Sequence, residues 1–326
     1  MKYLKTINTI ITGGICMALG AAVFFIGFAA SGFKFKTLST DDYDKKNMTV
    51  SSDTKAIEIY EDDTNINISR SDDNKIHITY FENKDEKYNI SDGDTLKIKK
   101  VSSKKLRFGF STQITSLNIS IPEKCKPSVR IDSDCGNIKV ENVISQSCDI
   151  SVEDGNIIIN KFSAEGKSDI STDSGNINFS DSKFNGDFTV KTDDGNILTE
   201  NCSYDKKADI KTTCGNVTMK EITYSSYLSL KTSDGNVNAD KCNFEGKTEI
   251  KTDCGNVTVN EITCMADTSV KTSDGNVRGN INGKKDDFNI ISKTSDGSNN
   301  LDDKINGRDK TLDVQTGCGN IKLEFK

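Results

Sequence analysis

The amino-acid sequence predicts an all-β fold, a parallel β-solenoid made of stacked repeats of about 20 residues. Three observations predict this fold class. A tetrapeptide of the form Asp/Cys-Gly-Asn-Ile/Val returns at a nearly fixed interval, apolar and polar residues alternate around it, and the composition suits strands and turns. The chain has two prolines and no tryptophan, and its net charge of -6 comes from interspersed acids and bases. No basic face for nucleic acid is therefore expected.

The interval between the tetrapeptides is the strongest signal. Their glycines are separated by 19 residues, then by 20 six times, and then by 22 twice, with a degenerate Asp-Gly-Ser-Asn at Asp296. A constant interval of this length indicates stacked repeats, because one short unit cannot bury its apolar face alone. Residues 194–233 also align without gaps on residues 234–273, which indicates duplication of a pair of repeats. The turn residues predicted to form a ladder along the stack are Gly136, Asn137, Gly155, Asn156, Gly175, Asn176, Gly195, Asn196, Gly215, Asn216, Gly235, Asn236, Gly255, Asn256, Gly275, Asn276, Gly319 and Asn320.

Each repeat is predicted to contain two strands. Apolar residues stand five positions before the glycine and two after it, threonine usually stands three before it, and charged or small polar residues lie between. This period of two is that of a β-strand. A repeat therefore reads as strand, tight Gly-Asn turn, strand and looser turn. The glycine is expected to supply a positive φ, and the stacked asparagine amides are expected to satisfy one another and the turn backbone.

An antiparallel sandwich of hairpins with Asp-Gly and Gly-Asn turns is the alternative fold. Repeats without gaps favour the solenoid, because the loops of a sandwich vary in length. The solenoid is predicted over residues 131–326, and its last residues, 320–326, are expected to close one end. Residues 51–130 lack the period and are predicted to form an N-terminal β cap with strands at 56–60, 66–70, 75–81, 96–101 and 116–122.

The N-terminal segment differs from the rest of the chain. Residues 7–33 carry no charge and are long enough to cross a hydrocarbon core of roughly 30 Å as a helix. We expect a transmembrane anchor at 7–33 that contacts the lipid bilayer, a cytoplasmic tail at 1–6 and a linker at 34–50. A cleaved signal peptide is the alternative, because Ala29, Ala30 and Ser31 are small enough for a cleavage site. In the anchored reading the protein is a single-pass protein of the cell membrane, and its repeats lie outside the cytoplasm.

The order of these segments resembles a bacterial family of β-strand repeats of unknown function that is described as "putative adhesin" and is common in Gram-positive bacteria. The resemblance is carried by the uncharged anchor, by Ser116–Pro122 (SLNISIP), by Val129–Val143 (VRIDSDCGNIKVENV) and by the repeated KTSDGNV units, and it covers residues 55–326. It implies a β-solenoid ectodomain, a membrane or surface location, and a link to adhesion or to envelope stress. It implies no catalytic residues.

The cysteines beyond the anchor have three alternative interpretations. They are small apolar filler that alternates with Asp or Ser at the turn, or they form disulfides within a coil (Cys202 with Cys214, Cys242 with Cys254), or they bind a metal. The filler reading is favoured. A metal site is disfavoured because the sequence has no Cys-x-x-Cys spacing and no histidine near these cysteines.

The aspartates at the turns and the lysines four positions before the glycine each have two interpretations. Aspartates at the turns suggest calcium, but they mostly alternate with Cys or Ser, so that neighbouring coils do not supply a second carboxylate. Acceptance of turn N–H bonds by aspartate is the preferred reading. The lysines four positions before the glycine are expected to form a solvated outward stripe, with the binding of anionic wall polymers as the alternative: Lys191, Lys211, Lys231, Lys251 and Lys271.

No constellation for catalysis stands out in the sequence. The single histidine, His77, lies in a predicted strand, where a half-exposed structural role is expected, and there is no nucleophile elbow or phosphate-binding loop. We therefore expect a non-enzymatic protein without cofactor or metal. The leading hypothesis is an adhesin-like or envelope-associated scaffold that binds a cell-wall polymer or a membrane protein. The alternative is an envelope-stress sensor that acts through a protein partner.

Overall fold

The computed structural model describes Val23, Ile26, Ala29 and residues 42–102, 115–303 and 307–326. The tail predicted at 1–6, most of the anchor predicted at 7–33 and residues 34–41 of the linker lie outside this part of the chain. Among the described residues, no helix has the length and apolar character needed to cross a membrane. The linker prediction is wrong for residues 44–50, because Asp44–Ser51 form strand β1, which pairs with β4 (Lys75–Glu82).

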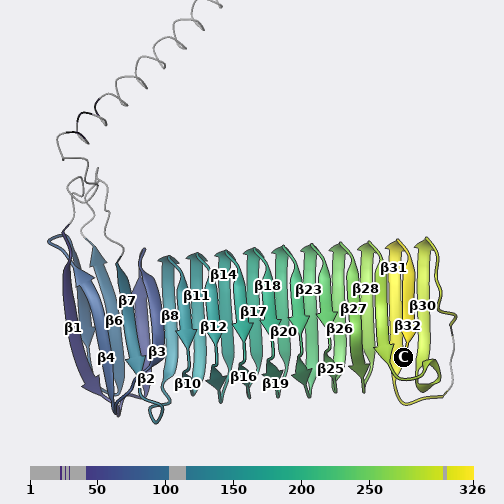
Figure 1. Ribbon diagram of the computed structural model, residues 1–326, viewed down its shortest axis with the longest axis horizontal. Helices are drawn as coiled ribbons and strands as arrows, with labels where there is room; N and C mark the ends of the chain where they lie inside the picture. Colours follow the sequence, from purple (N-terminus) through teal and green to yellow (C-terminus); the bar gives the residue numbers. More distant parts are fainter. Residues whose placement is uncertain (1–22, 24–25, 27–28, 30–41, 103–114, 304–306) are drawn as a thin grey trace, which may run out of the picture. The chain divides into compact units, whose positions relative to one another are not determined.

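The chain divides into two compact units. The first includes residues 42–46, 81–87 and Ser102 among those described; in it, the Tyr43 hydroxyl donates to the Glu86 carboxylate (3.0 Å). The second comprises Asn47–Tyr80, Tyr88–Val101 and Ser116–Lys326 and contains the repeats. Within this second unit the coils lie side by side in a row from β8 to β30 (Figure 1).

The repeats form a parallel β-solenoid with two facing sheets. In each regular coil a strand of seven or eight residues in the first sheet ends at the Gly-Asn turn, and a strand of four residues and then one of two residues follow in the second sheet. The first sheet contains, in spatial order, β5 (Glu86–Ser91), β6 (Thr95–Ser102), β2 (Ala56–Glu61), β8 (Ser128–Cys135), β11 (Ser147–Asp154), β14 (Ser168–Ser174), β17 (Phe188–Asp194), β20 (Ala208–Cys214), β23 (Tyr227–Asp234), β26 (Lys247–Cys254), β28 (Thr268–Asp274), β31 (Thr311–Cys318) and β30 (Asn289–Asp296).

The second sheet carries the shorter strands. Its longer members are β7 (Ser116–Ile121), β3 (Asn65–Arg70), β9 (Ile138–Glu141), β12 (Ile157–Asn160), β15 (Ile177–Ser180), β18 (Ile197–Glu200), β21 (Val217–Lys220), β24 (Val237–Asp240), β27 (Val257–Cys264), β29 (Val277–Asn282) and β32 (Ile321–Phe325), together with β1 and β4. Its two-residue members are β10 (Ile144–Ser145), β13 (Ser163–Ala164), β16 (Lys183–Phe184), β19 (Ser203–Tyr204), β22 (Thr223–Tyr224) and β25 (Asn243–Phe244). One short 3₁₀ helix, Lys285–Asp287, follows β29.

Successive coils pair in parallel and in register, so that equivalent columns of the sequence stack on one another. Ile150 pairs with Ile170, Ile170 with Val190, and Val190 with Ile210. This confirms the predicted parallel solenoid and excludes the hairpin sandwich for the repeats, because hairpins would pair neighbouring strands antiparallel. An antiparallel pair occurs in the N-terminal region, where β4 pairs with β7.

The N-terminal coils do not follow chain order. β2 and β3 pair directly with β8 and β9 of the first regular repeat, whereas β6 and β7, which come later than β2 and β3 in the chain, pair with the outer side of β2 and β3. The five strands predicted between residues 56 and 122 correspond to β2, β3, β4, β6 and β7. The coil formed by β2 and β3 is thus continuous with the solenoid in both sheets.

The C-terminal coils show the same inversion. β28 pairs with β31, and β30, which precedes β31 in the chain, pairs with the outer side of β31. β32 pairs with β29, and a bridge joins Asn299 to Ile321. The expectation that residues 320–326 close the end is therefore wrong, because β31 and β32 are inserted behind β30 and residues 299–300.

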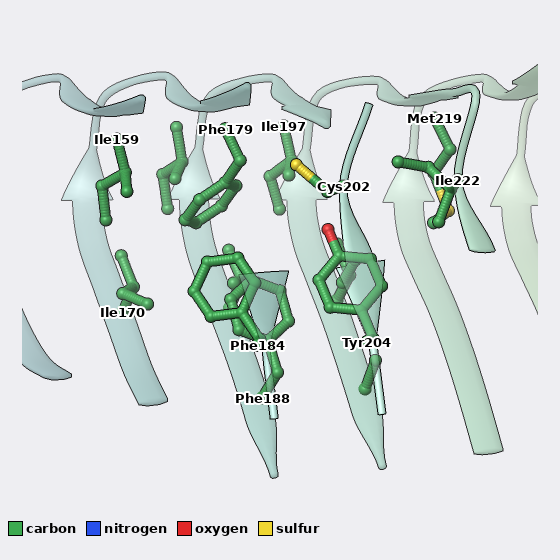
Figure 2. Close-up of a cluster of buried hydrophobic side chains, with 14 of the residues drawn as sticks. Ile159, Ile170, Phe179, Phe184, Phe188, Ile197, Cys202, Tyr204, Met219 and Ile222 are labelled. Carbon is green, nitrogen blue, oxygen red and sulfur yellow. The ribbon is translucent and has the colours of Figure 1, made fainter. Parts of the chain in front are cut away.

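The core lies between the two sheets. Inward residues are buried in every coil, and Figure 2 shows a central part of this core, in which Phe179, Phe184, Phe188 and Tyr204 gather. The ring centroids of Phe184 and Phe188 are 4.2 Å apart, and those of Phe188 and Tyr204 are 4.8 Å apart. The buried Tyr204 hydroxyl donates to Thr199 Oγ1 at 2.9 Å. Burial of each large apolar side chain contributes about 1.5–3 kcal/mol, so stability accumulates coil by coil.

Candidate interaction surface

The turn asparagines form a continuous hydrogen-bonded ladder. In each coil the asparagine backbone N–H and its Nδ2 both donate to Oδ1 of the asparagine in the neighbouring coil; for Asn216 and Asn196 the distances are 2.9 and 3.0 Å. The ladder begins at Asn65, passes through Asn137 and every turn asparagine to Asn276, and then includes Asn320, whose Oδ1 accepts from Ser298. The structure thus brings together all the asparagines singled out in the sequence, in the order set by the inserted C-terminal coil.

The turn glycines are required for close approach between coils rather than for a positive φ. Among the repeat glycines, Gly136, Gly297 and Gly319 have φ of 115°, 147° and 157°, and the others have no positive φ. A Cβ added to Gly215 would lie 2.0 Å from the carbonyl oxygen of Gly195, and the distance is 1.9–2.1 Å at the other turn glycines except Gly136, where it is 2.7 Å. The reason given for the glycine from sequence was therefore wrong at most turns: a side chain has no room there.

The threonine column has a role that the sequence did not assign. Each Thr hydroxyl donates to the carbonyl oxygen of the turn glycine in the adjacent coil, at 2.8–3.0 Å, as from Thr212 to Gly195 and from Thr232 to Gly215. These threonines are buried. The sequence signal for this contact was the recurrence of threonine three positions before the turn glycine.

The second turn of each coil uses non-glycine residues in the left-handed region. Seven residues, each six or so positions after a turn glycine, have φ of 49–56°: Asn142, Lys161, Asp181, Asn201, Glu221, Lys241 and Glu261. Their side-chain types vary, so this conformation could not be predicted from residue type. The turn moves the chain from the four-residue strand to the two-residue strand.

The exposed cysteines lie in a column that alternates with aspartate. Because β31 is inserted beside β28, Cys318 stacks on Asp274, and the spatial order of the column becomes Asp194, Cys214, Asp234, Cys254, Asp274, Cys318 and Asp296. The neighbouring aspartates raise the pKa of the Cys214 and Cys318 thiols, through a hydrogen bond and through charge.

The remaining thiols are buried, and desolvation raises the pKa of Cys202 and Cys242 to about 11. All cysteines in the described part of the chain are free, which excludes the Cys202–Cys214 and Cys242–Cys254 pairs in this structure. Within the described residues, no group of three or more His, Cys, Asp or Glu side chains could hold a metal ion. Because their pKa values are raised, the Cys202 and Cys242 thiols are neutral at neutral pH.

The outer face of the first sheet is charged and in part self-neutralised. Lys191 lies 3.0 Å from Asp193, Lys251 lies 3.2 Å from Asp253, and Lys271 lies 2.9 Å from Asp313 of the inserted strand β31. These side chains are half-exposed, so each pair contributes little stability. Lys211 and Lys231, the other two lysines of the predicted stripe, have no ion pair among the described residues, so the stripe is neutralised only in part.

The outer face of the second sheet is different, because six consecutive coils show no charged residue at the two positions nearest the turn. We call these two rows the uncharged strip: Asn156, Asn176, Asn196, Asn216, Asn236 and Asn256 in the ladder row, and Ile158, Asn178, Leu198, Thr218, Asn238 and Thr258 two residues further on. Charged residues border the strip, with Lys139 before it and Arg278 after it.

Two adjoining hollows lie at the Arg278 end of the uncharged strip. One, of about 240 Å³, is lined by Asn236, Asn238, Asn256, Thr258 and Arg278. The other, of about 380 Å³, shares Thr258 and Arg278 and extends to Lys322 and Glu324. Gly279, which has a φ of 139°, lines it where the register between β27 and β29 shifts.

A buried polar cluster occupies the N-terminal coils of the second unit. Glu61 accepts a hydrogen bond from the Tyr88 hydroxyl, and its other carboxylate oxygen lies 4.0 Å from the buried Lys100 ammonium, which also contacts Asp63 and Thr64. Desolvation raises the pKa of Glu61 to about 7. His77 lies apart, with Nε2 2.9 Å from the Asp73 carboxylate, and its side chain is 42% exposed.

The fold and these faces define a class: a parallel β-solenoid whose uninterrupted coils present repetitive polar faces. The chain belongs to the Toastrack DUF4097 family, whose model matches residues 54–243 and 206–324. No curated protein matches the chain.

Solved structures with low similarity include three bacterial proteins. A putative cell adhesion protein from Clostridium sporogenes is 12% identical, covers 88% of this chain and 100% of its own, and gives a TM-score of 0.20. A putative adhesin from Bacteroides fragilis is 13% identical, with coverages of 87% and 97% and a TM-score of 0.35. A putative lipid binding protein from Parabacteroides distasonis is 12% identical, with coverages of 88% and 98% and a TM-score of 0.33.

Proposed function

We propose that this protein is a non-enzymatic, adhesin-like scaffold of the bacterial cell envelope, anchored in the membrane through residues 7–33 and carrying its solenoid outside the cytoplasm. The observation that carries the proposal is the unbroken repetition of the coils. From Gly155 to Gly275 every interval is 20 residues, so no loop is inserted that could build a catalytic cleft on either face. A long surface with the same groups in every coil suits a polymeric or repetitive partner.

The electrostatics of the coils support a binding role over a catalytic one. Catalytic groups generally need a pKa tuned toward the working pH in a cleft. Here three lysines of the first sheet, Lys191, Lys251 and Lys271, pair with neighbouring aspartates, and the thiols have raised pKa values. Glu61, the carboxyl with a pKa of about 7, is buried under Tyr88 and Lys100 rather than placed in an open cleft.

Location is tested by protease digestion of intact cells and of wall-stripped protoplasts, with an antibody against the solenoid and a cytoplasmic protein as control. Because a regular solenoid resists proteases, a variant with a protease site inserted at Gly307, which has no heavy atom within 4 Å of an added Cβ, serves as the reporter. Cleavage of this variant on protoplasts whose cytoplasmic control is intact supports the proposal. Protection on protoplasts until lysis would refute the extracytoplasmic location.

A further inference from the structure

The uncharged strip offers one unused hydrogen-bond donor in every coil. An asparagine side-chain amide has two N–H groups. In the ladder, Nδ2 of each asparagine donates once to the neighbouring Oδ1, at 3.0–3.3 Å along the strip, and that Oδ1 accepts both bonds from the next coil. One amide N–H per coil therefore remains for a ligand, at the strand spacing of about 4.8 Å.

The second row of the strip adds apolar and hydroxyl surface beside these donors. Ile158 is 39% exposed, Leu198 is half-buried, and Thr218 presents a hydroxyl in the same row. A ligand that fits must carry oxygen acceptors along its length and C–H surface between them. It must also be extended, because six coils place the same groups over roughly 24 Å.

Charge decides between the polymers that meet these needs. A charged chain laid on the strip would lose water without gaining a counter-charge, which is unfavourable. Ionic side chains lie outside the two rows of the strip: at its ends, as Lys139 and Arg278, and in the rows beside it, where Glu200, Lys220 and Asp240 are of both signs. These flanking charges offer no uniform counter-charge to a charged chain. The strip therefore complements an uncharged chain.

We propose that the uncharged strip binds an uncharged polysaccharide, whose hydroxyl or acetamido oxygens accept from the ladder amides and whose ring C–H groups contact Ile158 and Leu198. The adjoining hollows around Arg278 accommodate substituents of the chain at one end of the strip. This inference rests on the proposed binding function and adds the ligand class and the face. Binding is the sum of weak contacts repeated along the strip, so it requires a polymer.

The test is co-sedimentation of the full chain, purified in mild detergent, with three insoluble polymers at pH 6: chitin, which is uncharged, cross-linked carboxymethyl cellulose, which is anionic, and cross-linked chitosan, which is cationic. Isolated cell envelopes form a fourth arm. The variant Asn178→Asp/Thr218→Asp/Asn238→Asp places three carboxylates on the strip. The matched control, Ser151→Asp/Thr189→Asp/Ser273→Asp, places three on exposed positions of the first sheet.

We expect wild type and the control variant to sediment with chitin more than with either charged polymer, and the strip variant to bind chitin at least tenfold more weakly. Equal binding of both variants to chitin, or preference for a charged polymer, would overturn the inference. Binding of wild type to envelopes but not to chitin would also overturn it and would leave the proposed function standing. If wild type binds neither envelopes nor any of the polymers, both the proposed function and this inference are refuted. Circular dichroism of both variants verifies that they are folded.

Discussion

The central coils and the N-terminal coils of the solenoid use the same buried column in opposite ways. In the centre the position three before the turn holds threonine, which donates to a glycine carbonyl of the adjacent coil. In the N-terminal coils the equivalent column holds Glu61, which pairs in register with Ser133 of the first regular coil, and Lys100 lies beside it. Repetition lets identical neighbours satisfy one another. A coil near the end has an unlike neighbour, and here the column holds Glu61 beside Lys100 instead of threonine.

The largest effect is expected from deletion of residues 311–326. If coils stacked in chain order, this deletion would remove only the outermost coil. Because β31 lies between β28 and β30, its loss should leave β30 without its pairing strand and remove amide protection over Asn289–Asp296. Hydrogen-exchange mass spectrometry of the truncated and full chains measures this. Retained protection of β30 would mean that it can pair directly with β28.

The substitution Gly215→Ala tests the crowded centre. Its Cβ would lie 2.0 Å from Gly195 O, and because the obstacle is backbone, we expect destabilisation of at least about 3 kcal/mol and a lower midpoint of thermal unfolding. The matched variant is Gly93→Ala, in the N-terminal region, where φ is 147° and no heavy atom lies within 4 Å of the Cβ. There only backbone strain of about 1–2 kcal/mol is expected. Equal destabilisation by the two substitutions would show that backbone conformation, and not the close approach of neighbouring coils, requires glycine at the central turns.

A smaller and pH-dependent effect is expected for Glu61→Gln. Burial raises the pKa of Glu61 from 4.5 to about 7. Stability from this group is therefore fully present below pH 4.5 and is lost as the pH rises through about 7, because the folded state must then release a proton from a buried site. Wild type should lose on the order of 3 kcal/mol over this window relative to the variant. Urea unfolding at pH 5 and pH 8 measures the difference, and parallel pH profiles would show that Glu61 does not titrate there.

The smallest effect is expected for Thr232→Val. The change removes the hydroxyl that donates to Gly215 O at 2.8 Å and leaves a buried carbonyl with one fewer partner, at a cost of about 1–2 kcal/mol. Thr189→Val, on the exposed face of the first sheet, should change stability by less than about 0.5 kcal/mol. Thermal unfolding of the two variants measures the difference. If their unfolding midpoints are equal, the threonine hydroxyl does not stabilise the central coils.

The repeats were predictable and the ends were not, for a physical reason. In the centre each column has one environment, so residue type, spacing and partner repeat together, and strands, turns and the asparagine ladder can be read from the interval of 20. The order of β30 and β31 cannot, because both strands end at an Asp/Cys-Gly turn, which does not indicate which of them pairs with β28. The Glu61 cluster was also missed, since it joins Glu61, Tyr88 and Lys100 from three strands without a repeat.

The faces were only partly predictable. The lysine stripe is evident in sequence, but the pairing of three of its lysines with Asp193, Asp253 and Asp313 depends on rotamers and on the inserted strand. The uncharged strip was not singled out, because its second row mixes Ile, Asn, Leu and Thr. The residues of that row share a lack of charge rather than a residue type, and this is seen only when the coils are stacked.

The inversion of the C-terminal coils has a consequence for synthesis of the chain. On the ribosome β30 is made before β31, the one strand with which it pairs in the described structure. Until residues 311–318 emerge, β30 and its inward Ile290 have no sheet to join, while the coils before it can assemble in the order of their synthesis. In the observed order β30 can take its place only after β31 has paired with β28, so the last strand to join the first sheet is not the last one synthesised.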